Sequence, residues 1–318
     1  MTTTAFPVNP QLTAIAMAYR NPAVSLIADK VLPRVLTAKK FNYTVYDAAQ
    51  GYTIPSTLVG RKSEPTQVDF QGTAVNDEVL DYGLDDIIPN DEIEAFAAMP
   101  KPATGGPMSP ETASTMYLES LIQLDREVRV AAKVFAAASY ASGFSTTLSG
   151  TSQWSDYTNS NPLAVILDAL DIPLVRPNVA VLGQATFTKL RQHPKVVQAV
   201  YGTSQGAGTV TRQQLAELLE VSEVLVGGSF VNTARKGQTP VMARTWGKHA
   251  AFLYVDAMAA ETRQPTFGWT AQWGPKQVSS IAEPAKGLRG SVRIRNGESV
   301  KEVISANGLG YFFQNAVA

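Results

Sequence analysis

The chain has 318 residues, with 27 basic and 27 acidic side chains that cancel to a formal net charge of zero. This balance argues against a strongly cationic nucleic-acid binder, and the absence of cysteine excludes disulfides, thiolate nucleophiles and cysteine-ligated metals. Charged residues make up 17% of the chain, against a usual share of about 25%, which favours a protein that holds much of its surface in contacts with other chains.

Residues 1–40 predict an N-terminal arm that contains a short amphipathic helix at 10–20, with Asn9 as its N-cap. The first ten residues lack the basic and apolar regions of a signal peptide, and no stretch of about 18 uninterrupted apolar residues occurs. We therefore expect an unexported, soluble protein without a membrane partner.

Two segments with alternating aromatic or β-branched residues, 41–47 and 67–75, predict the strands of an extended hairpin loop that spans 41–76. The stretch between them has no clear period, and a structureless segment of about 19 residues is unusual inside a compact domain. We expect this tip to project and to contact an adjacent subunit, with a disordered surface loop as the alternative. The candidate contact residues at the tip are Tyr52, Ile54, Leu58, Arg61 and Lys62.

Charge is distributed unevenly along the chain. Residues 77–94 carry eight acidic residues and no basic one, whereas residues 261–301 carry seven basic and three acidic residues. The acidic run lacks the central Gly and terminal Glu of a calcium loop, so we assign no metal. We expect the two regions to meet between subunits. The candidate residues for this contact are Asp85, Asp86, Arg289, Arg293 and Arg295.

The longest predicted element is a helix over 109–141, in which Ser109 is the N-cap, Pro110 takes the first position and Gly143 follows the end. Seven apolar residues recur at spacings of three and four and predict the buried stripe: Tyr117, Leu121, Leu124, Val128, Ala131, Phe135 and Ala138. Arg126 and the other charged residues fall mostly off this stripe. We expect a spine that supports an elongated molecule; a long core helix of an ordinary α+β protein is the alternative.

A polar connector leads into a mixed α/β unit over 161–260, and residues 261–318 predict a second sheet. The unit comprises helices at 163–170, 184–194 and 211–219 and strands at 178–183, 223–227, 240–246 and 250–255. The strands of the second sheet are expected at 266–273, 289–295 and 309–317. We interpret His193 as a cation at a helix end before Pro194.

The signals for catalysis are weak. Residues 202–206 match the G-x-S-x-G nucleophile pattern, but they lack a preceding strand, and no Asp lies between Ser204 and His249. An α/β hydrolase with Ser204 as nucleophile therefore remains only as an alternative to a structural, non-catalytic protein, and a host-surface or DNA-binding module is a further alternative. The two histidines lack zinc-ligand spacing, and there is no phosphate loop or dinucleotide fingerprint, so we predict no cofactor.

In their order, these segments resemble the major capsid protein of a tailed bacteriophage, with the Hong Kong phage-type capsid fold. The segments that carry the resemblance are IADKVLPRV, DYGLDDIIPNDEIEA, NVAVLGQATFTKLRQHPKVV, LLEVSEVLVGGSFVN, and WGKHAAFLYVDA followed by TFGWTAQW. The resemblance implies an α+β fold with an N-terminal arm (1–40), an extended hairpin loop (41–76), a peripheral domain with the spine helix (77–160), an axial domain (161–260), and a peripheral sheet and C-terminus (261–318).

The resemblance also implies a function without catalysis. The chain would self-assemble into hexamers and pentamers of an icosahedral shell around phage double-stranded DNA, which it would contact without sequence specificity. Assembly in the host cytoplasm would involve a separate scaffolding protein, a portal and decoration proteins, and would end in the virion capsid. Some relatives crosslink a hairpin-loop lysine to an asparagine. Lys62 is the candidate lysine, with Asn296, Asn307 and Asn315 as candidate partners, and a solubilising loop cation is the alternative for Lys62.

Overall fold

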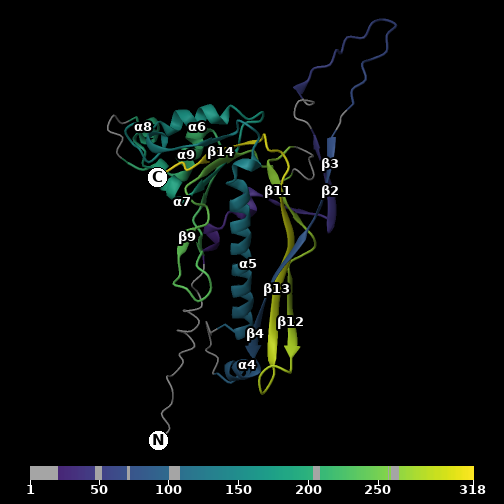
Figure 1. Ribbon diagram of the computed structural model, residues 1–318, viewed down its shortest axis with the longest axis vertical. Coiled ribbons are helices and arrows are strands. Elements are labelled where there is room, and N and C mark those ends of the chain that lie inside the picture. The colour runs from purple at the N-terminus through teal and green to yellow at the C-terminus, as the bar shows by residue number, and fades with distance from the viewer. Residues whose placement is uncertain are drawn as a thin grey trace.

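The computed structural model describes residues 21–46, 52–69, 72–99, 108–202, 208–256, 258 and 265–318. The molecule is elongated. A long helix and long strands run down its length, a unit of helices and strands lies at one end, and a hairpin projects beside that unit (Figure 1). The predicted helix at 10–20 and the candidate nucleophile Ser204 lie outside the described residues.

A five-stranded sheet, which we call the peripheral sheet, forms the long part of the molecule. Its strands are β1 (Arg34–Leu36), β4 (Leu80–Pro89), β11 (Gly268–Gln272), β12 (Gln277–Glu283) and β13 (Ser291–Ile304), in the order β1-β11-β13-β12 with β4 paired to β13. Because β4 and β12 both pair with residues 291–297, they lie on opposite edges of β13. Helix α4 (Asn90–Ala97) follows β4.

Strand β13 has 14 residues and continues well past the predicted end at 295. It passes through Gly297, which lies opposite Gly83 of β4. A Cβ at Gly297 would come within 2.8 Å of the Tyr82 carbonyl oxygen and 3.3 Å of the Gly83 Cα. The facing glycines therefore allow two backbones to approach closely, and the ladder is not interrupted.

Helix α5 (Pro110–Val134) packs against β13 and β4 and has 25 residues. The predicted cap is confirmed, because the Ser109 hydroxyl accepts a hydrogen bond from the Thr112 N–H at 3.2 Å. The predicted end at 141 is wrong. The Tyr140 hydroxyl donates to the Val134 carbonyl at 2.8 Å and the Ser139 hydroxyl to the Lys133 carbonyl at 2.6 Å, so side chains satisfy the last carbonyls and the helix stops there.

The predicted buried stripe of α5 is also wrong over most of its length, although Ala131 is buried and Phe135 packs against a hydrophobic core. Tyr117 is 45% exposed and Val128 is only half-buried. The buried residues of α5 are Ser114, Leu118, Ile122, Arg126, Glu127, Val130, Ala131 and Val134. A line with a spacing of four therefore faces the subunit interior, and a charged residue, Arg126, occupies its middle.

A second five-stranded sheet, which we call the axial sheet, lies at one end of the molecule. Its strands are β5 (Ser145–Thr147), β6 (Val179–Gly183), β7 (Glu223–Gly227), β10 (Ala250–Leu253) and β14 (Gly310–Gln314), in the order β5-β14-β10-β6-β7. The prediction that 309–317 belongs to the second sheet is wrong, because β14 pairs with β10 and β5. Phe312 and Phe313 point to opposite faces of the sheet, and each is buried in a hydrophobic core on its own face. Strand β14 therefore belongs to a sheet that is covered on both faces.

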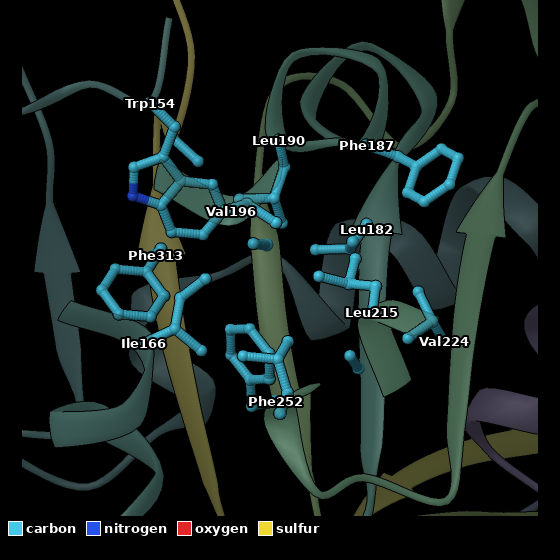
Figure 2. Packing of buried hydrophobic residues seen from close by; sticks show 14 of the residues in the cluster. Trp154, Ile166, Leu182, Phe187, Leu190, Val196, Leu215, Val224, Phe252 and Phe313 are labelled. Carbon is cyan, nitrogen blue, oxygen red and sulfur yellow. The ribbon is translucent and has the colours of Figure 1, made fainter. Parts of the chain in front are cut away.

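Helices cover one face of the axial sheet. They are α6 (Pro162–Leu170), α7 (Gln184–Leu190), α8 (Pro194–Tyr201) and α9 (Arg212–Leu219). Leu182, Phe252 and Phe313 project from alternate strand positions into this core, beside Trp154 and helix residues (Figure 2). The neighbouring positions, among them Val181, Leu253 and Phe312, enter a second core that contains α2 (Ala28–Val31) and the end of α5. Because successive side chains of a strand point to opposite faces of the sheet, the same strands contribute residues to both cores.

His193 begins α8 and does not act as the predicted cation at a helix end. Its Nδ1 accepts from the Lys195 N–H at 3.2 Å, so Nε2 carries the proton and donates to the Ser160 hydroxyl at 3.0 Å. The side chain is fully buried, and burial lowers the pKa of His193. A neutral imidazole that caps a helix replaces the expected charge.

Two smaller hairpins complete the described elements. Strands β2 (Lys40–Tyr46) and β3 (Gly72–Glu78) pair antiparallel, so the predicted pairing is confirmed, but β3 begins later than the predicted strand at 67–75. Trp269 packs against Phe41 and Tyr43, with ring centroids 5.5 and 6.1 Å away. Strands β8 (Phe230–Asn232) and β9 (Met242–Arg244) pair with each other, so the strand predicted at 240–246 lies outside the axial sheet. Short 3₁₀ turns occur at η1 (Ala23–Ser25), η2 (Ala137–Ser139) and η3 (Gly150–Ser152).

Candidate assembly surfaces

The tip of the hairpin is the most exposed segment that the structure describes. Every residue from 52 to 69 is exposed, and the segment lies beyond the paired part of β2 and β3, away from the rest of the molecule (Figure 1). Ile54 is 91% exposed and Leu58 is 90% exposed. The tip therefore carries all five predicted contact residues on one segment: Tyr52, Ile54, Leu58, Arg61 and Lys62. Large apolar side chains that no part of their own chain covers are typical of a contact surface.

The charges of β4 and β13 pair with each other across the peripheral sheet. Asp85 lies opposite Arg295 and accepts two hydrogen bonds from its guanidinium, both at 2.8 Å. Arg293 donates to Asp85 at 3.2 Å and also pairs with Glu283 of β12. Hydrogen bonds from Arg295 first, and then from Arg293, lower the pKa of Asp85 to about 2. This carboxylate is thus firmly ionised and joins two strands.

The remaining predicted charges also find partners in their own chain. Arg289 lies 3.0 Å from Glu94 and 3.4 Å from Asp91, which joins β13's leading loop to α4. Asp86 accepts a hydrogen bond from the Ser114 hydroxyl of α5 at 2.7 Å. These charges are thus already paired within one subunit, and a contact between the two charged regions of different subunits stays a prediction. The paired charges join β4, α4, α5 and β13 within one subunit, because the antiparallel register brings together residues about 200 positions apart.

The three asparagines that were candidates for a bond to Lys62 lie in different surroundings. Asn296 is 1% exposed and donates to Glu119 at 3.1 Å, so a lysine of another chain would not reach it without opening the sheet. Asn315 is exposed but follows β14 in the axial sheet, not the peripheral sheet as predicted. Asn307 is exposed in the turn between β13 and β14.

Glu127 forms a buried polar junction that the sequence analysis missed. Its carboxylate accepts from the N–H groups of Ile27 and Ala28 at 2.8 and 2.9 Å, and from the Trp246 indole at 2.5 Å. Burial raises the pKa of Glu127, while the three N–H donors and Arg126 oppose that shift. The side chain ties the start of α2 and the segment after β9 to the spine helix.

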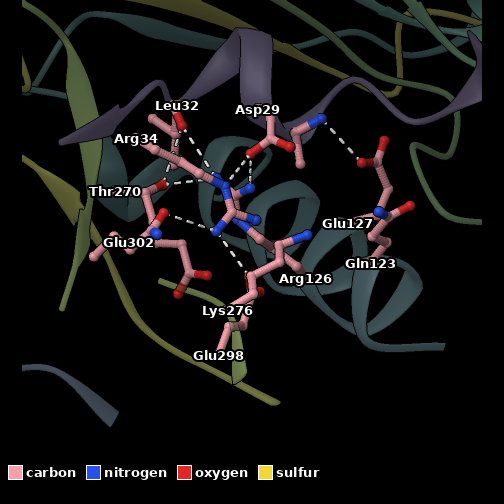
Figure 3. A network of polar contacts seen from close by, with 12 residues as sticks. Asp29, Leu32, Arg34, Gln123, Arg126, Glu127, Thr270, Lys276, Glu298 and Glu302 are labelled. Carbon is pink, nitrogen blue, oxygen red and sulfur yellow. Dashed lines mark hydrogen bonds and ion pairs between the residues drawn. The ribbon is translucent and has the colours of Figure 1, made fainter. Parts of the chain in front are cut away.

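Arg126 forms the second half of this network (Figure 3). Its guanidinium donates to the Leu32 carbonyl at 3.2 Å and to the Thr270 hydroxyl at 3.0 Å, and it pairs with Asp29. Burial lowers the pKa of Arg126, and nearby carboxylates oppose the shift. Arg34 continues the network from Asp29 to Glu298, at 2.7 Å each. The one sequence signal for this network is a charged pair placed between apolar residues at Ile122 and Val130.

Within the described ranges, no helix is both long enough and apolar enough to cross a membrane. No group of three or more His, Asp or Glu side chains in the same ranges could hold a metal ion.

Comparison with known proteins supports a single family. A family model described as phage major capsid protein E matches residues 143–260. The major capsid protein of Pseudomonas phage JBD67 is 49% identical over 319 residues, which covers 100% of both chains. The major capsid protein of Burkholderia phage BcepMu is 25% identical over 83% of this chain and 82% of its own length.

Solved structures share the fold at low identity. A phage-related protein from Bordetella bronchiseptica RB50 has a TM-score of 0.70 at 20% identity and covers 98% of both chains. The capsid of cyanophage P-SCSP1u has a TM-score of 0.58 at 9% identity and covers 99% of this chain and 92% of its own. These neighbours confirm the predicted α+β tailed-phage capsid fold, and the hydrolase alternative finds no support. The chain belongs to the family of phage major capsid proteins, which are structural proteins of the virion shell and not enzymes.

Proposed function

We propose that the chain assembles into hexamers and pentamers of an icosahedral shell, in which residues 52–69 of each subunit lie on an adjacent subunit. The observation that carries this proposal is the complete exposure of the tip, with Ile54 and Leu58 at least 90% exposed. Burying one side chain of this size stabilises a contact by about 1.5–3 kcal/mol. The same contact repeated around a closed ring of subunits would give each tip the apolar partner that the described part of its own chain does not supply.

The proposal extends to the partners that membership of the family suggests. The shell would enclose double-stranded DNA without reading its sequence, which is compatible with a formal net charge of zero. A separate scaffolding protein, a portal and decoration proteins would take part in assembly, which would occur in the host cytoplasm. These partners are supported by the 49% identical relative being a phage major capsid protein.

A pair of double variants tests the role of the tip. Ile54→Asp with Leu58→Asp places two carboxylates where apolar contact is expected, whereas Ser56→Asp with Ser63→Asp adds the same charge to the same exposed segment. Removing both contacts costs about 3–6 kcal/mol per tip. We expect the first variant to give folded subunits without shells in electron micrographs, and the second to assemble.

Circular dichroism melts of both variants should match the parent chain, because no described residue of the tip belongs to a core. Shells of normal form from the Ile54 and Leu58 variant would show that the tip is not an assembly contact. Loss of shells from both variants would point to charge repulsion and would also contradict an apolar contact.

A further inference from the structure

The β8–β9 hairpin lies in a basic segment between two strands of the axial sheet, β7 and β10. Residues 224–255 contain no Asp or Glu, although the whole chain has equal numbers of acidic and basic residues. The exposed cations of this segment are Arg235, Lys236, Arg244 and Lys248. The hairpin lies beside α5, on the side opposite to β13 and away from the tip at 52–69 (Figure 1). A chain without net charge thus has a locally positive hairpin.

The cations of this segment differ from those of the peripheral sheet in having no acidic partner. Arg293 and Arg295 both pair with Asp85, whereas no carboxylate among the described residues forms an ion pair with any of the four cations. The residues outside the described ranges include two acidic side chains, Asp47 and Glu261, which are too few for four cations. The hairpin therefore retains net positive charge that another molecule can neutralise.

The turn of the hairpin holds two of these cations in a defined place. The Gln238 N–H donates to the Arg235 carbonyl at 3.1 Å, which closes a β-turn over residues 235–238. Gly237 has a φ of 89° at the third position of this turn, where a type II turn requires glycine. Arg235 and Lys236 therefore occupy the first two positions of an ordered turn at the exposed end of the hairpin.

The stem of the hairpin is held by its own side chains. The Asn232 Oδ1 accepts hydrogen bonds from the N–H groups of Ala234 and Val241 at 3.0 and 2.9 Å. Arg244 lies over the Phe230 ring, 4.6 Å from its centroid. The ring face attracts and orients the guanidinium but brings no negative charge of its own. The cations of the hairpin are thus positioned without being neutralised.

We propose that the β8–β9 hairpin contacts the phosphate backbone of double-stranded DNA. The inference rests on the proposed function, in which the shell encloses DNA, and it names the surface of the subunit that meets the DNA. Phosphate oxygens accept hydrogen bonds from Arg, Lys, Thr, Gln and backbone N–H groups. The loop at 233–240, with the sequence TARKGQTP, supplies all of these donors. It contains no Leu, Ile, Val, Met or aromatic residue that would anchor a protein partner.

The length of the hairpin suits a duplex. Arg244 pairs with Phe230 at the start of the stem, and at about 3.3 Å per residue the five residues from Phe230 to Arg235 span up to about 16 Å. Duplex DNA carries one charge per about 1.7 Å of its axis, so a hairpin of this length lies within reach of several phosphates. Contacts of this kind do not depend on base sequence.

Binding of a short DNA duplex to unassembled subunits tests the proposal, measured by fluorescence anisotropy at salt concentrations of about 50 to 200 mM. Arg235→Gln with Lys236→Gln removes the two cations of the turn, and Lys236→Gln with Lys248→Gln is a second pair. Lys40→Gln with Lys286→Gln is the matched control, because these lysines are also exposed and form no ion pair with a described residue. Circular dichroism melts should show that all three variants fold like the parent chain.

We expect each hairpin variant to reduce the slope of log affinity against log salt by about 2, because each phosphate contact contributes about 0.9. Affinity at the lowest salt concentration should fall about tenfold. The control should bind like the parent chain, and duplexes of different sequence should bind equally. A parent chain that does not bind the duplex, or an equal loss in the hairpin variants and the control, would overturn the proposal.

The competing partner is an acidic segment of another protein, and polyglutamate with the same number of charges as the duplex is its probe. Tighter binding of polyglutamate than of the duplex, with the same loss in the hairpin variants, would assign the hairpin to an acidic protein and refute the proposal. DNA binding is measured on unassembled subunits, so its failure leaves the tip experiment unaffected. Normal shells from the Ile54 and Leu58 variant would refute the tip contact and leave the DNA measurement unaffected.

Discussion

Replacing Glu127 with Ala should lower the free energy of unfolding of the subunit by about 3–5 kcal/mol. The carboxylate is 1% exposed and accepts hydrogen bonds from Ile27, Ala28 and the Trp246 indole. Ala would leave three buried donors without an acceptor, at about 1–3 kcal/mol each. The same change removes a carboxylate whose desolvation raises the pKa of Glu127, and this relief offsets part of the cost of the three unpaired donors. The expected loss therefore lies towards the lower end of the summed cost.

Urea unfolding of soluble subunits, followed by circular dichroism and tryptophan fluorescence, measures the effect, and Trp246 reports directly on the lost contact. Asp125→Ala is the control. Its side chain is 57% exposed and pairs with Arg129 one helical turn away, so we expect a loss of about 0.5 kcal/mol or less. If the two variants lose the same free energy, Glu127 does not join these elements energetically, and the reasoning from its three donors is refuted.

Two further predictions concern the spine and the charge ladder. Val130→Asp should prevent folding, because Val130 is fully buried and an unpaired carboxylate there costs several kcal/mol, whereas Val128→Asp at a half-buried position should still give folded subunits; equal melts by circular dichroism would contradict the observed burial. Asp85→Asn should flatten the dependence of stability on pH. The pKa of Asp85 is lowered to about 2, so its ionised form stabilises the fold above its unfolded pKa of about 4, and this contribution is lost as the pH falls through about 2. Unfolding curves at intervals from pH 2 to pH 7 measure this slope, and an unchanged slope in the variant would count against the pairing with Arg295.

The features that the sequence predicted well are those determined by residues close together in the chain. Ser109 caps α5 as expected, and the helix predicted at 211–219 begins with a capping box of Thr211 and Gln214. Strand β6 contains only buried residues, as its short apolar run predicts. A cap or a buried strand is encoded within a few positions, so a single sequence is sufficient to find it.

The predictions fail where contacts with distant parts of the chain determine which residues are buried. On α5, the sequence offers two adjacent apolar lines, and the choice between them depends on β4 and β13, which contact only one. Arg126 made the buried line hard to recognise, because a charged residue is buried only where other segments supply partners for it. Its partners Thr270 and Asp29 come from such distant segments. The hairpin tip was easier to identify, because its lack of apolar periodicity is a local property.

The charge pairs within the subunit help to fix the register of β4 against β13 in the long part of the molecule, where hydrophobic packing specifies it weakly. The core cluster beneath β4 and β13 contains three buried residues, Ile88, Leu118 and Ile294, whereas the two clusters at the axial sheet are far larger. So small a core specifies strand register weakly. In the observed register Asp86 lies opposite Ile294 on the face toward α5, and Asp85 lies opposite Arg295 on the other face.

A slip of one residue would turn the side chains of one strand to the opposite face. In β13 it would bring Arg293 or Arg295 towards Ile88 and Leu118, turn Ile294 to the outer face and separate Asp85 from its partners. These changes are costly, because a buried cation without a partner and a lost bidentate pair each disfavour the slipped state. The alternating charges thus exclude the wrong register more strongly than they stabilise the correct one. This accounts for charges that lie along β4 and β13 and find their partners inside the subunit, while the apolar side chains of the hairpin tip, which we propose as the assembly contact, remain exposed.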